Sequence, residues 1–188
     1  MLMKLEAIVR TYIRRIRPKA HAELNWFRQQ PSLHAAIEKA ALAINSQGNR
    51  YSHQRRLQQD SLQQAYQALE AKTETIAETD DFDDLHGLID RILNPIPGIG
   101  ELYVYDTSLR IGAKLNLLPT RVYLHAGTRV GARALGLDAS GPSINTSALP
   151  REFRSLPPHE IEDILCIFKD KLRLKANAEI IAARSWCG

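Results

Sequence analysis

Apolar residues recur at intervals of three and four positions along most of this chain of 188 residues, and that spacing constrains the fold more than any other feature. Such intervals return side chains to one face of an α-helix, whereas a half-buried strand alternates apolar and polar residues at every second position. The sequence shows no convincing alternation of β-branched residues at the shorter period, and no clear internal repeat. We therefore predict an all-α fold, a multi-helix bundle of about seven or eight helices.

The composition is that of a globular protein. Apolar residues make up 44% of the sequence and charged residues 24%, which is enough for a well-buried core and unlike a disordered chain. The net charge of +4 permits a nucleic acid or an acidic surface as partner without requiring either. We expect an N-terminal helical segment at residues 1–84 and a core with the C-terminal helix at residues 85–188, or one continuous domain.

Cysteine usage and hydropathy indicate the cellular compartment. Cys166 and Cys187 form neither a disulfide framework nor a zinc-ligand spacing, so we predict a cytoplasmic protein with no metal and no cofactor. No apolar run approaches the ~20 residues that a membrane-spanning helix needs. The N-terminal segment carries charges throughout and lacks the cleavage site of a secretory signal. We expect no membrane partner.

Two arginine-rich segments are candidates for contact with phosphates. The first predicted helix, at residues 2–16, carries a stripe of arginines that suits phosphates or anionic lipid, or is a solvated face. The second segment, at residues 49–56, contains three arginines beside a tyrosine: Arg50, Arg55 and Arg56. Guanidinium groups near an aromatic ring suit phosphate or base contacts, but exposed arginines that follow a helix cap give the same pattern.

An acidic run at residues 78–84 precedes the central part of the chain. Carboxylates at this density could bind a divalent cation, but the run lacks the glycine and the ligand spacing of an EF-hand loop. Acids before an apolar helical pattern also cap the helix and suit the positive end of its dipole. We favour the capping interpretation.

A turn rich in proline and glycine separates two helical patterns near the centre of the chain. The sequence from Leu93 to Gly100 reads LNPIPGIG, and helical spacing precedes it and resumes directly after it. Gly98 and Gly100 let the backbone take positive φ, while Ile99 between them fills the angle between the helices. Amides at the start of the second helix could then hold one phosphate. The same arrangement also serves as a plain tight connection between helices.

This turn resembles the hairpin of helix-hairpin-helix DNA-binding proteins, and the resemblance covers roughly residues 85–135. The segment from Asp106 to Arg110, DTSLR, is faintly similar to the aspartate-bearing segment of helix-hairpin-helix DNA glycosylases. The resemblance implies that the hairpin amides grip a DNA phosphate without reading sequence, and that Asp106 is a candidate catalytic residue acting on an extruded nucleotide. Glu101, directly after the second glycine, stabilises the helix start but repels a phosphate.

A second candidate catalytic residue lies in the sequence RVYLHAGTRVGARAL, residues 121–135. His125 is close in sequence to two arginines and could serve in acid–base chemistry or phosphate binding, although a single histidine on a helix is usually structural. Gly127 and Gly131 are four residues apart, so they allow a close helix crossing or a short turn between two helices.

The last predicted helix begins at Pro157 and Pro158 and carries Cys166. His159 precedes this cysteine by seven residues, or about 10 Å along a helix, too far for direct contact. A nucleophilic Cys166 would need His125 or His53 brought in by the fold, and core packing is the simpler interpretation. Both flanks of this helix are apolar, so we expect it to be central to the fold or to form a homodimer.

We therefore predict a DNA-associated helical protein that binds the nucleic-acid backbone with little sequence preference through a helix-hairpin-helix. The residues expected to contact the nucleic acid are the hairpin residues and the basic residues of three segments: Gly98, Ile99, Gly100, Arg110, Lys114, Arg129, Arg133, Arg50, Arg55 and Arg56. The alternative is a helical protein–protein interaction or dimerisation module with no nucleic-acid role. A third hypothesis is an enzyme that acts on a nucleic acid.

Overall fold

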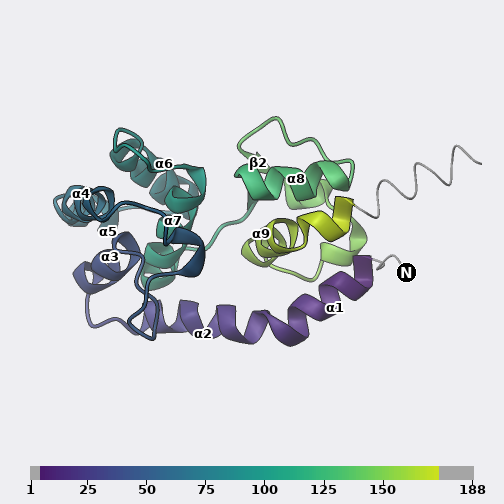
Figure 1. The fold of residues 1–188 in the computed structure, drawn as a ribbon, viewed down its shortest axis with the longest axis horizontal. Helices are drawn as coiled ribbons and strands as arrows, with labels where there is room; N and C mark the ends of the chain where they lie inside the picture. The colour runs from purple at the N-terminus through teal and green to yellow at the C-terminus, as the bar shows by residue number, and fades with distance from the viewer. Residues whose placement is uncertain (1–4, 174–188) are drawn as a thin grey trace, which may run out of the picture. The chain divides into compact units, whose positions relative to one another are not determined.

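The computed structural model describes residues 5–173, and this part of the chain is mostly helical (Figure 1). The predicted all-α fold is confirmed: the described residues form nine α-helices and one pair of two-residue strands. None of these helices combines the length and the apolar character needed to cross a membrane. The second cysteine, Cys187, lies outside the described residues.

The chain divides into two compact units. Met1–Pro18 and Pro119–Gly188 together make one unit, called here the terminal unit, and Lys19–Leu118 makes the other, called the central unit. The division does not fall between residues 84 and 85, where the sequence suggested it. The reason is that α6 (Phe82–Leu93) packs against α4 and α7 inside the central unit, so a boundary at its first turn would cut through a core.

The central unit is a bundle in which α3 packs against both α4 and α7. Its elements are α2 (Arg17–Arg28, entering at Lys19), α3 (Leu33–Ala41), η1 (Ser52–Gln54), α4 (Gln59–Glu70), α5 (Thr73–Ala77), α6 (Phe82–Leu93) and α7 (Glu101–Leu115). The buried face of α3 contains Ala36, Ala40 and Ala41, and such small side chains let neighbouring helices approach closely. Tyr103 of α7 donates a hydrogen bond to the carbonyl of Ala41, which ties α7 to the end of α3.

The apolar spacing of residues 57–76 is that of one long helix, but the chain turns between α4 and α5. Lys72 leaves helical geometry at φ −117°, and Thr73 Oγ1 donates a hydrogen bond to the Glu70 carbonyl at 2.7 Å. Leu69 before the turn and Ile76 after it are both fully buried in one core. The apolar spacing therefore continues across the turn, and periodicity alone did not reveal the break.

Capping residues mark both ends of the α6–α7 segment. Asp81 precedes α6 in an extended conformation and accepts a hydrogen bond from the Asp84 amide at 2.9 Å, so the capping interpretation of the acidic run is confirmed. At the other end, α7 stops at Asn116, which adopts left-handed geometry with φ 63°. The two helices pack against each other.

The terminal unit forms around α9. Its elements are α1 (Leu5–Arg15), β1 (Val122–Tyr123), α8 (Ala126–Ala134), β2 (Ser143–Ile144), η2 (Thr146–Ala148), η3 (Arg151–Phe153) and α9 (Pro158–Ile167). The two strands pair antiparallel, with Val122 opposite Ile144. α1 contacts α9 and η3, and the Tyr12 hydroxyl of α1 donates a hydrogen bond to Asp163 Oδ2 at 2.7 Å. This bond ties the beginning of the chain to its last described helix.

Helices α8 and α9 approach each other unusually closely. A Cβ atom on Gly131 would lie 2.2 Å from the carbonyl oxygen of Leu165, so only glycine fits at this crossing. The predicted close helix crossing at the paired glycines is confirmed, and its partner is α9.

Candidate functional site

The turn between α6 and α7, residues 94–100, is stabilised by hydrogen bonds within its own backbone and by one hydrogen bond from α4. The Ile96 amide bonds to the Leu93 carbonyl at 2.9 Å, and the Ile99 amide bonds to the Ile96 carbonyl at 3.2 Å. Ser61 Oγ of α4 donates a hydrogen bond to the Pro97 carbonyl at 2.8 Å. Gly98 has φ +83°, the left-handed geometry that glycine adopts without strain. The turn is therefore a fixed surface.

The tip of this turn lies on the outside of the central unit. Pro97, Gly98 and Gly100 are exposed, and Ile99 is half-buried. Gly100 is the N-cap of α7 and supplies no side chain to cap it. Among the backbone hydrogen bonds of the described residues outside regular helices and strands, the amides of Gly98 and Gly100 donate none. The positive end of α7 thus faces outward, with the exposed carboxylate of Glu101 in its first turn.

The arginines at residues 50–56 divide into two kinds. Arg50 holds its own loop, because its guanidinium donates to the Leu57 carbonyl at 3.1 Å and also bonds Gln59 Oε1. Arg55 and Arg56 are exposed on the short segment that leads into α4. Only this second kind offers its charge to a partner.

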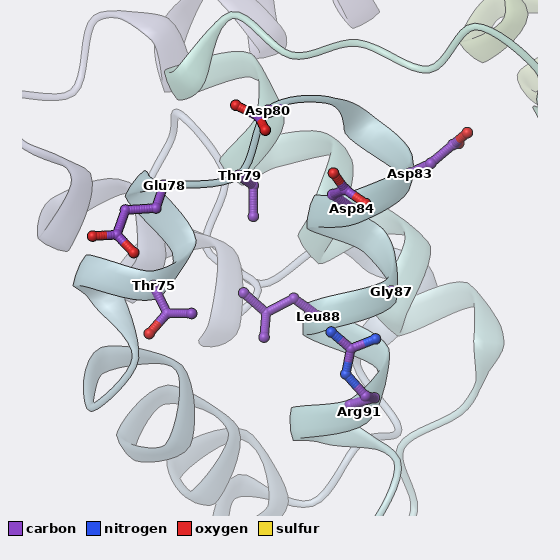
Figure 2. Close-up of a pocket in the computed structure, with 9 residues that line it drawn as sticks. All are labelled: Thr75, Glu78, Thr79, Asp80, Asp83, Asp84, Gly87, Leu88 and Arg91. Carbon is purple, nitrogen blue, oxygen red and sulfur yellow. The ribbon is translucent and has the colours of Figure 1, made fainter.

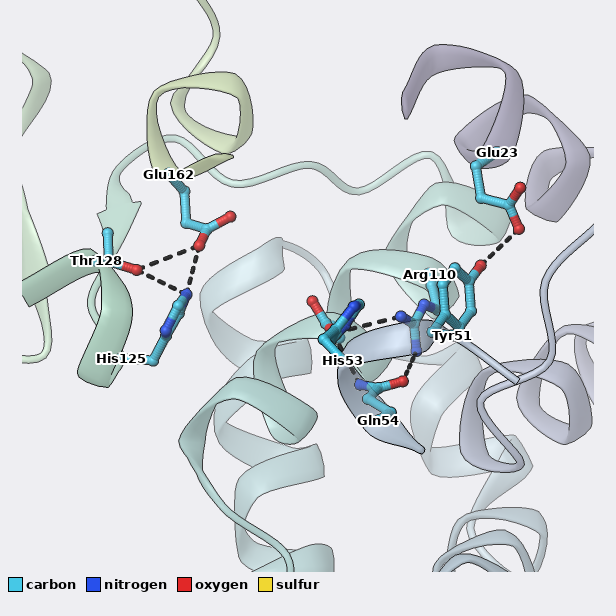
Figure 3. A network of polar contacts seen from close by, with 9 residues as sticks. Glu23, Tyr51, His53, Gln54, Arg110, His125, Thr128 and Glu162 are labelled. Carbon is cyan, nitrogen blue, oxygen red and sulfur yellow. Dashed lines mark hydrogen bonds and ion pairs between the residues drawn. The ribbon is translucent and has the colours of Figure 1, made fainter. Parts of the chain in front are cut away.

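Arg110 is buried in a network of polar side chains (Figure 3). One of its nitrogens donates to Gln54 Oε1 at 3.1 Å, and another lies 3.3 Å from Asp106 Oδ2. The guanidinium carbon also stands 3.8 Å from the centre of the Tyr51 ring, a cation–π contact. The positive charge of Arg110 is therefore committed within the protein.

Asp106 is the centre of the same network. Besides Arg110, it contacts His53 Nε2 at 2.7 Å and accepts a hydrogen bond from Gln54 Nε2 at 2.8 Å, and its side chain is 16% exposed. We use the name Asp106 cluster for Asp106, Arg110, His53, Gln54 and Tyr51. Burial raises the pKa of the Tyr51 hydroxyl, which donates to Glu23 Oε1 at 2.6 Å. The cluster connects η1 to α7 through Asp106 and to α2 through the bond from Tyr51 to Glu23, so it stabilises the packing of the central unit.

Lys114 also bonds within the protein. Its ammonium donates to the carbonyls of Arg28 and Gln30, at 3.3 and 2.5 Å. A cation at the end of α2 suits the negative end of that helix. Lys114 is half-buried there.

Arg129 and Arg133 belong to the terminal unit, a different unit from the turn. Arg129 donates to the Ala139 and Gly141 carbonyls, at 3.2 and 2.6 Å, and so fastens the loop after α8. Arg133 is exposed. The predicted contact residues therefore come from both units.

His125 is the N-cap residue of α8 and lies in a buried group with Thr128 and Glu162 (Figure 3). Its Nε2 atom contacts Glu162 Oε1 and lies 2.6 Å from Thr128 Oγ1, which donates to Glu162 Oε1 at 3.2 Å. Cys166 follows Glu162 by one helical turn and belongs to the same group. We call these four residues the His125 cluster.

The acidic run lines a pocket of about 290 Å³ between α5 and α6 (Figure 2). Its charged lining residues are Glu78, Asp80, Asp83, Asp84 and Arg91. Figure 2 shows the carboxylates of Glu78 and Asp83 pointing in different directions from opposite sides of the pocket. The groups of potential metal ligands among the described residues include none from this pocket. Its negative charge disfavours phosphates on this face.

The chain matches no protein-family model, no curated protein and no solved structure. Function is therefore inferred from the residues and their geometry.

Sequence reasoning missed several members of the two clusters. Gln54 and Glu162 showed no signal, because a glutamine and a glutamate near the start of a helix look like ordinary surface residues. One signal was present: a nucleophilic Cys166 would need a histidine from elsewhere in the fold, and His125 lies in the same group as Cys166.

Proposed function

We propose that the central unit binds the backbone of DNA, with little sequence preference, at the turn between α6 and α7. The observation that carries the proposal is the exposure of Gly98 and Gly100 at the uncapped start of α7. Backbone amides aligned with a helix dipole bind a phosphate through its oxygens, and they do not depend on the identity of the base.

Positive charge for this interface comes from Arg55 and Arg56. The first turn of α4 contacts the α6–α7 turn through Ser61, and Arg56 precedes Ser61 by five residues. The two Cα atoms are therefore at most about 18 Å apart. A phosphate chain that crosses the turn can reach these arginines. Arg110 and Lys114 are assigned to the interior of the unit, because their charges are already bonded.

The test is a fluorescence anisotropy titration with labelled duplexes of unrelated sequence and with single-stranded DNA. We expect similar affinities for all duplexes, and an affinity whose logarithm falls linearly with the logarithm of salt concentration. Arg55→Ala and Arg56→Ala should each weaken binding and reduce the salt slope by about 1. Glu101→Gln should strengthen binding because it removes a repulsive charge.

The matched control is Lys72→Ala, which removes an exposed cation just beyond the opposite end of α4 and should leave binding unchanged. No affinity for any nucleic acid at low salt would end the proposal. Equal affinity in the arginine variants would move the interface away from the turn.

The competing hypothesis is a homodimer formed through the C-terminal helix. Its support is Ile167, an exposed large apolar residue on α9 with 51% of its surface accessible. Most other apolar residues of this helix, including Ile161, Ile164 and Leu165, are buried in the terminal unit itself. A dimer in light scattering that Ile167→Asp dissociates, together with no nucleic-acid affinity, would support this alternative.

A further inference from the structure

We propose that His125, Glu162 and Cys166 form a binding site for a divalent metal ion of the zinc class in the terminal unit. The three side chains each offer one ligand atom, a ring nitrogen, a carboxylate oxygen and a thiol sulfur, and these atoms all lie within 4.8 Å of one another. His125 and Glu162 are buried, and Cys166 is half-buried.

The fold brings these ligands together from two helices. Glu162 and Cys166 are four residues apart on α9, so they share one face of that helix. His125 comes from the N-terminal end of α8, which packs directly against α9. Two of the three ligands therefore have fixed positions on regular helix, and the third is fixed at a helix cap.

Two glycines of α8 make room for the site. A Cβ on Gly127 would lie 2.8 Å from Cys166 Sγ and 3.5 Å from Cε1 of the His125 ring. A Cβ on Gly131 would collide with the backbone of Leu165. With any larger residue, α8 would stand away from α9 and separate the histidine from the cysteine. The close helix crossing thus gives the cysteine and the histidine a common space.

The donor set selects the class of metal. Nitrogen, oxygen and thiolate sulfur together are typical ligands of Zn²⁺, whereas Mg²⁺ and Ca²⁺ prefer oxygen alone. Three protein ligands around a tetrahedral ion leave one position for water or another ligand. The same atoms would bind Co²⁺ with a similar geometry, which supplies a spectroscopic probe.

A proton and a metal ion compete for these groups. His125 Nε2 and Glu162 Oε1 are in hydrogen-bond contact, and Thr128 Oγ1 bonds both of them. Ligand atoms around a tetrahedral zinc ion are about 3.3 Å apart, so the carboxylate moves outward when an ion replaces the shared proton. Thr128 then remains as a hydrogen-bond partner that orients a ligand.

The test uses the full chain, stripped of metal and titrated with Co²⁺. We expect one equivalent to bind, with a charge-transfer absorption from thiolate to cobalt and the visible bands of a four-coordinate ion. Cys187→Ser should keep the thiolate absorption, because Cys166 is then the sole cysteine. Cys166→Ser should abolish it, and His125→Gln and Glu162→Gln should each weaken Zn²⁺ binding at least about tenfold.

Matched controls are His34→Gln and Asp170→Asn, which change an exposed histidine and an exposed carboxylate outside the cluster and should leave binding unchanged. Circular dichroism without metal checks that each variant is folded. A second readout, in the Cys187→Ser chain, is alkylation of Cys166 by iodoacetamide, which Zn²⁺ should slow and a chelator restore. No binding at excess metal, a cobalt spectrum without thiolate absorption, or unchanged affinity in the histidine and glutamate variants would overturn the proposal.

Discussion

The Asp106 cluster and the His125 cluster each join a histidine to a carboxylate, yet they differ in how the carboxylate charge is balanced. Asp106 pairs with Arg110, whose guanidinium stays charged at any pH the protein meets. Glu162 pairs with His125 and Thr128, and a thiol stands within the same group. The histidines differ too: the His53 side chain is 45% exposed and the His125 side chain 2%.

This difference separates a structural network from a candidate binding site. The permanent positive charge of Arg110 already compensates the carboxylate of Asp106, so a metal ion would gain little by binding there. A histidine, a carboxylate and a thiol can exchange protons for a metal ion, and the fold keeps them close. We assign Asp106 a structural role and His125 a ligand role on this basis.

The largest expected effect is that of Arg110→Met. Methionine keeps only the apolar stem of the side chain. It removes the guanidinium, with its cation–π contact to Tyr51, and leaves Asp106 without that partner. We expect the central unit to lose about 3 kcal/mol of unfolding free energy, at the lower end for a broken buried pair because Asp106 keeps 16% exposure. Urea unfolding followed by Trp26 fluorescence, with Trp186 changed to phenylalanine, measures it.

Asp106→Asn added to Arg110→Met should restore part of the stability, because it removes the uncompensated carboxylate. A loss below about 1 kcal/mol in the single variant would show that the guanidinium does not hold this network.

Gly131→Ala tests the support of the other cluster. The added methyl meets the Leu165 backbone at 2.2 Å, so α8 and α9 must separate. We expect a loss of about 2 kcal/mol in the terminal unit, together with weaker Zn²⁺ binding. Hydrogen–deuterium exchange of the α8 and α9 amides reports this unit separately. Gly141→Ala, whose methyl would meet its nearest neighbour at an ordinary 3.8 Å, is the control, and equal exchange in both variants would contradict the close crossing.

His53→Gln should change little. His53 is on the surface, and Asp106 keeps Arg110 and Gln54 as partners. We expect a loss below about 1 kcal/mol in urea unfolding. A loss as large as that of Arg110→Met would mean that the histidine is the main partner of Asp106, and the contrast between the clusters would fail.

The smallest effect concerns pH and a histidine outside both clusters. Burial lowers the pKa of His86 below 6.5, although Asp90 and Asp83 act in the opposite direction. The unfolded chain therefore binds a proton more readily than the folded chain, and stability falls as pH decreases below about 6.5. In the His86→Gln variant, the unfolding free energy measured with urea should fall less steeply as the pH decreases below about 6.5. Parallel pH profiles for the two proteins would contradict the effect of burial.

The helices could be predicted from sequence because their apolar faces repeat locally and their ends carry caps. Asp81 and Asn116 show this directly. The turn at Lys72 could not be predicted, since Leu69 and Ile76 on either side of it bury in the same core. The packing of α1 with α9 in one unit depends on contacts between residues far apart in sequence, such as Tyr12 with Asp163.

The candidate sites were predicted in part. The turn at residues 94–100 could be predicted from its prolines and glycines, because proline restricts the backbone locally and glycine permits conformations that other residues avoid. Whether a basic residue is available depends on its tertiary partners: Arg50 and Arg110 resemble Arg55 and Arg56 in sequence, but they bond inside the unit. The His125 cluster arises from a helix crossing and has no local signature.

The most direct test of the proposed interface follows the backbone amides of the ¹⁵N-labelled chain by NMR during addition of a short DNA duplex at low salt. The chain has 10 glycines, and their amides can be assigned and compared within one spectrum. We predict that the resonances of Gly98 and Gly100 shift progressively with DNA and return when salt is raised. Shifts confined to other residues, with Gly98 and Gly100 unchanged at saturation, would contradict a phosphate site at this turn.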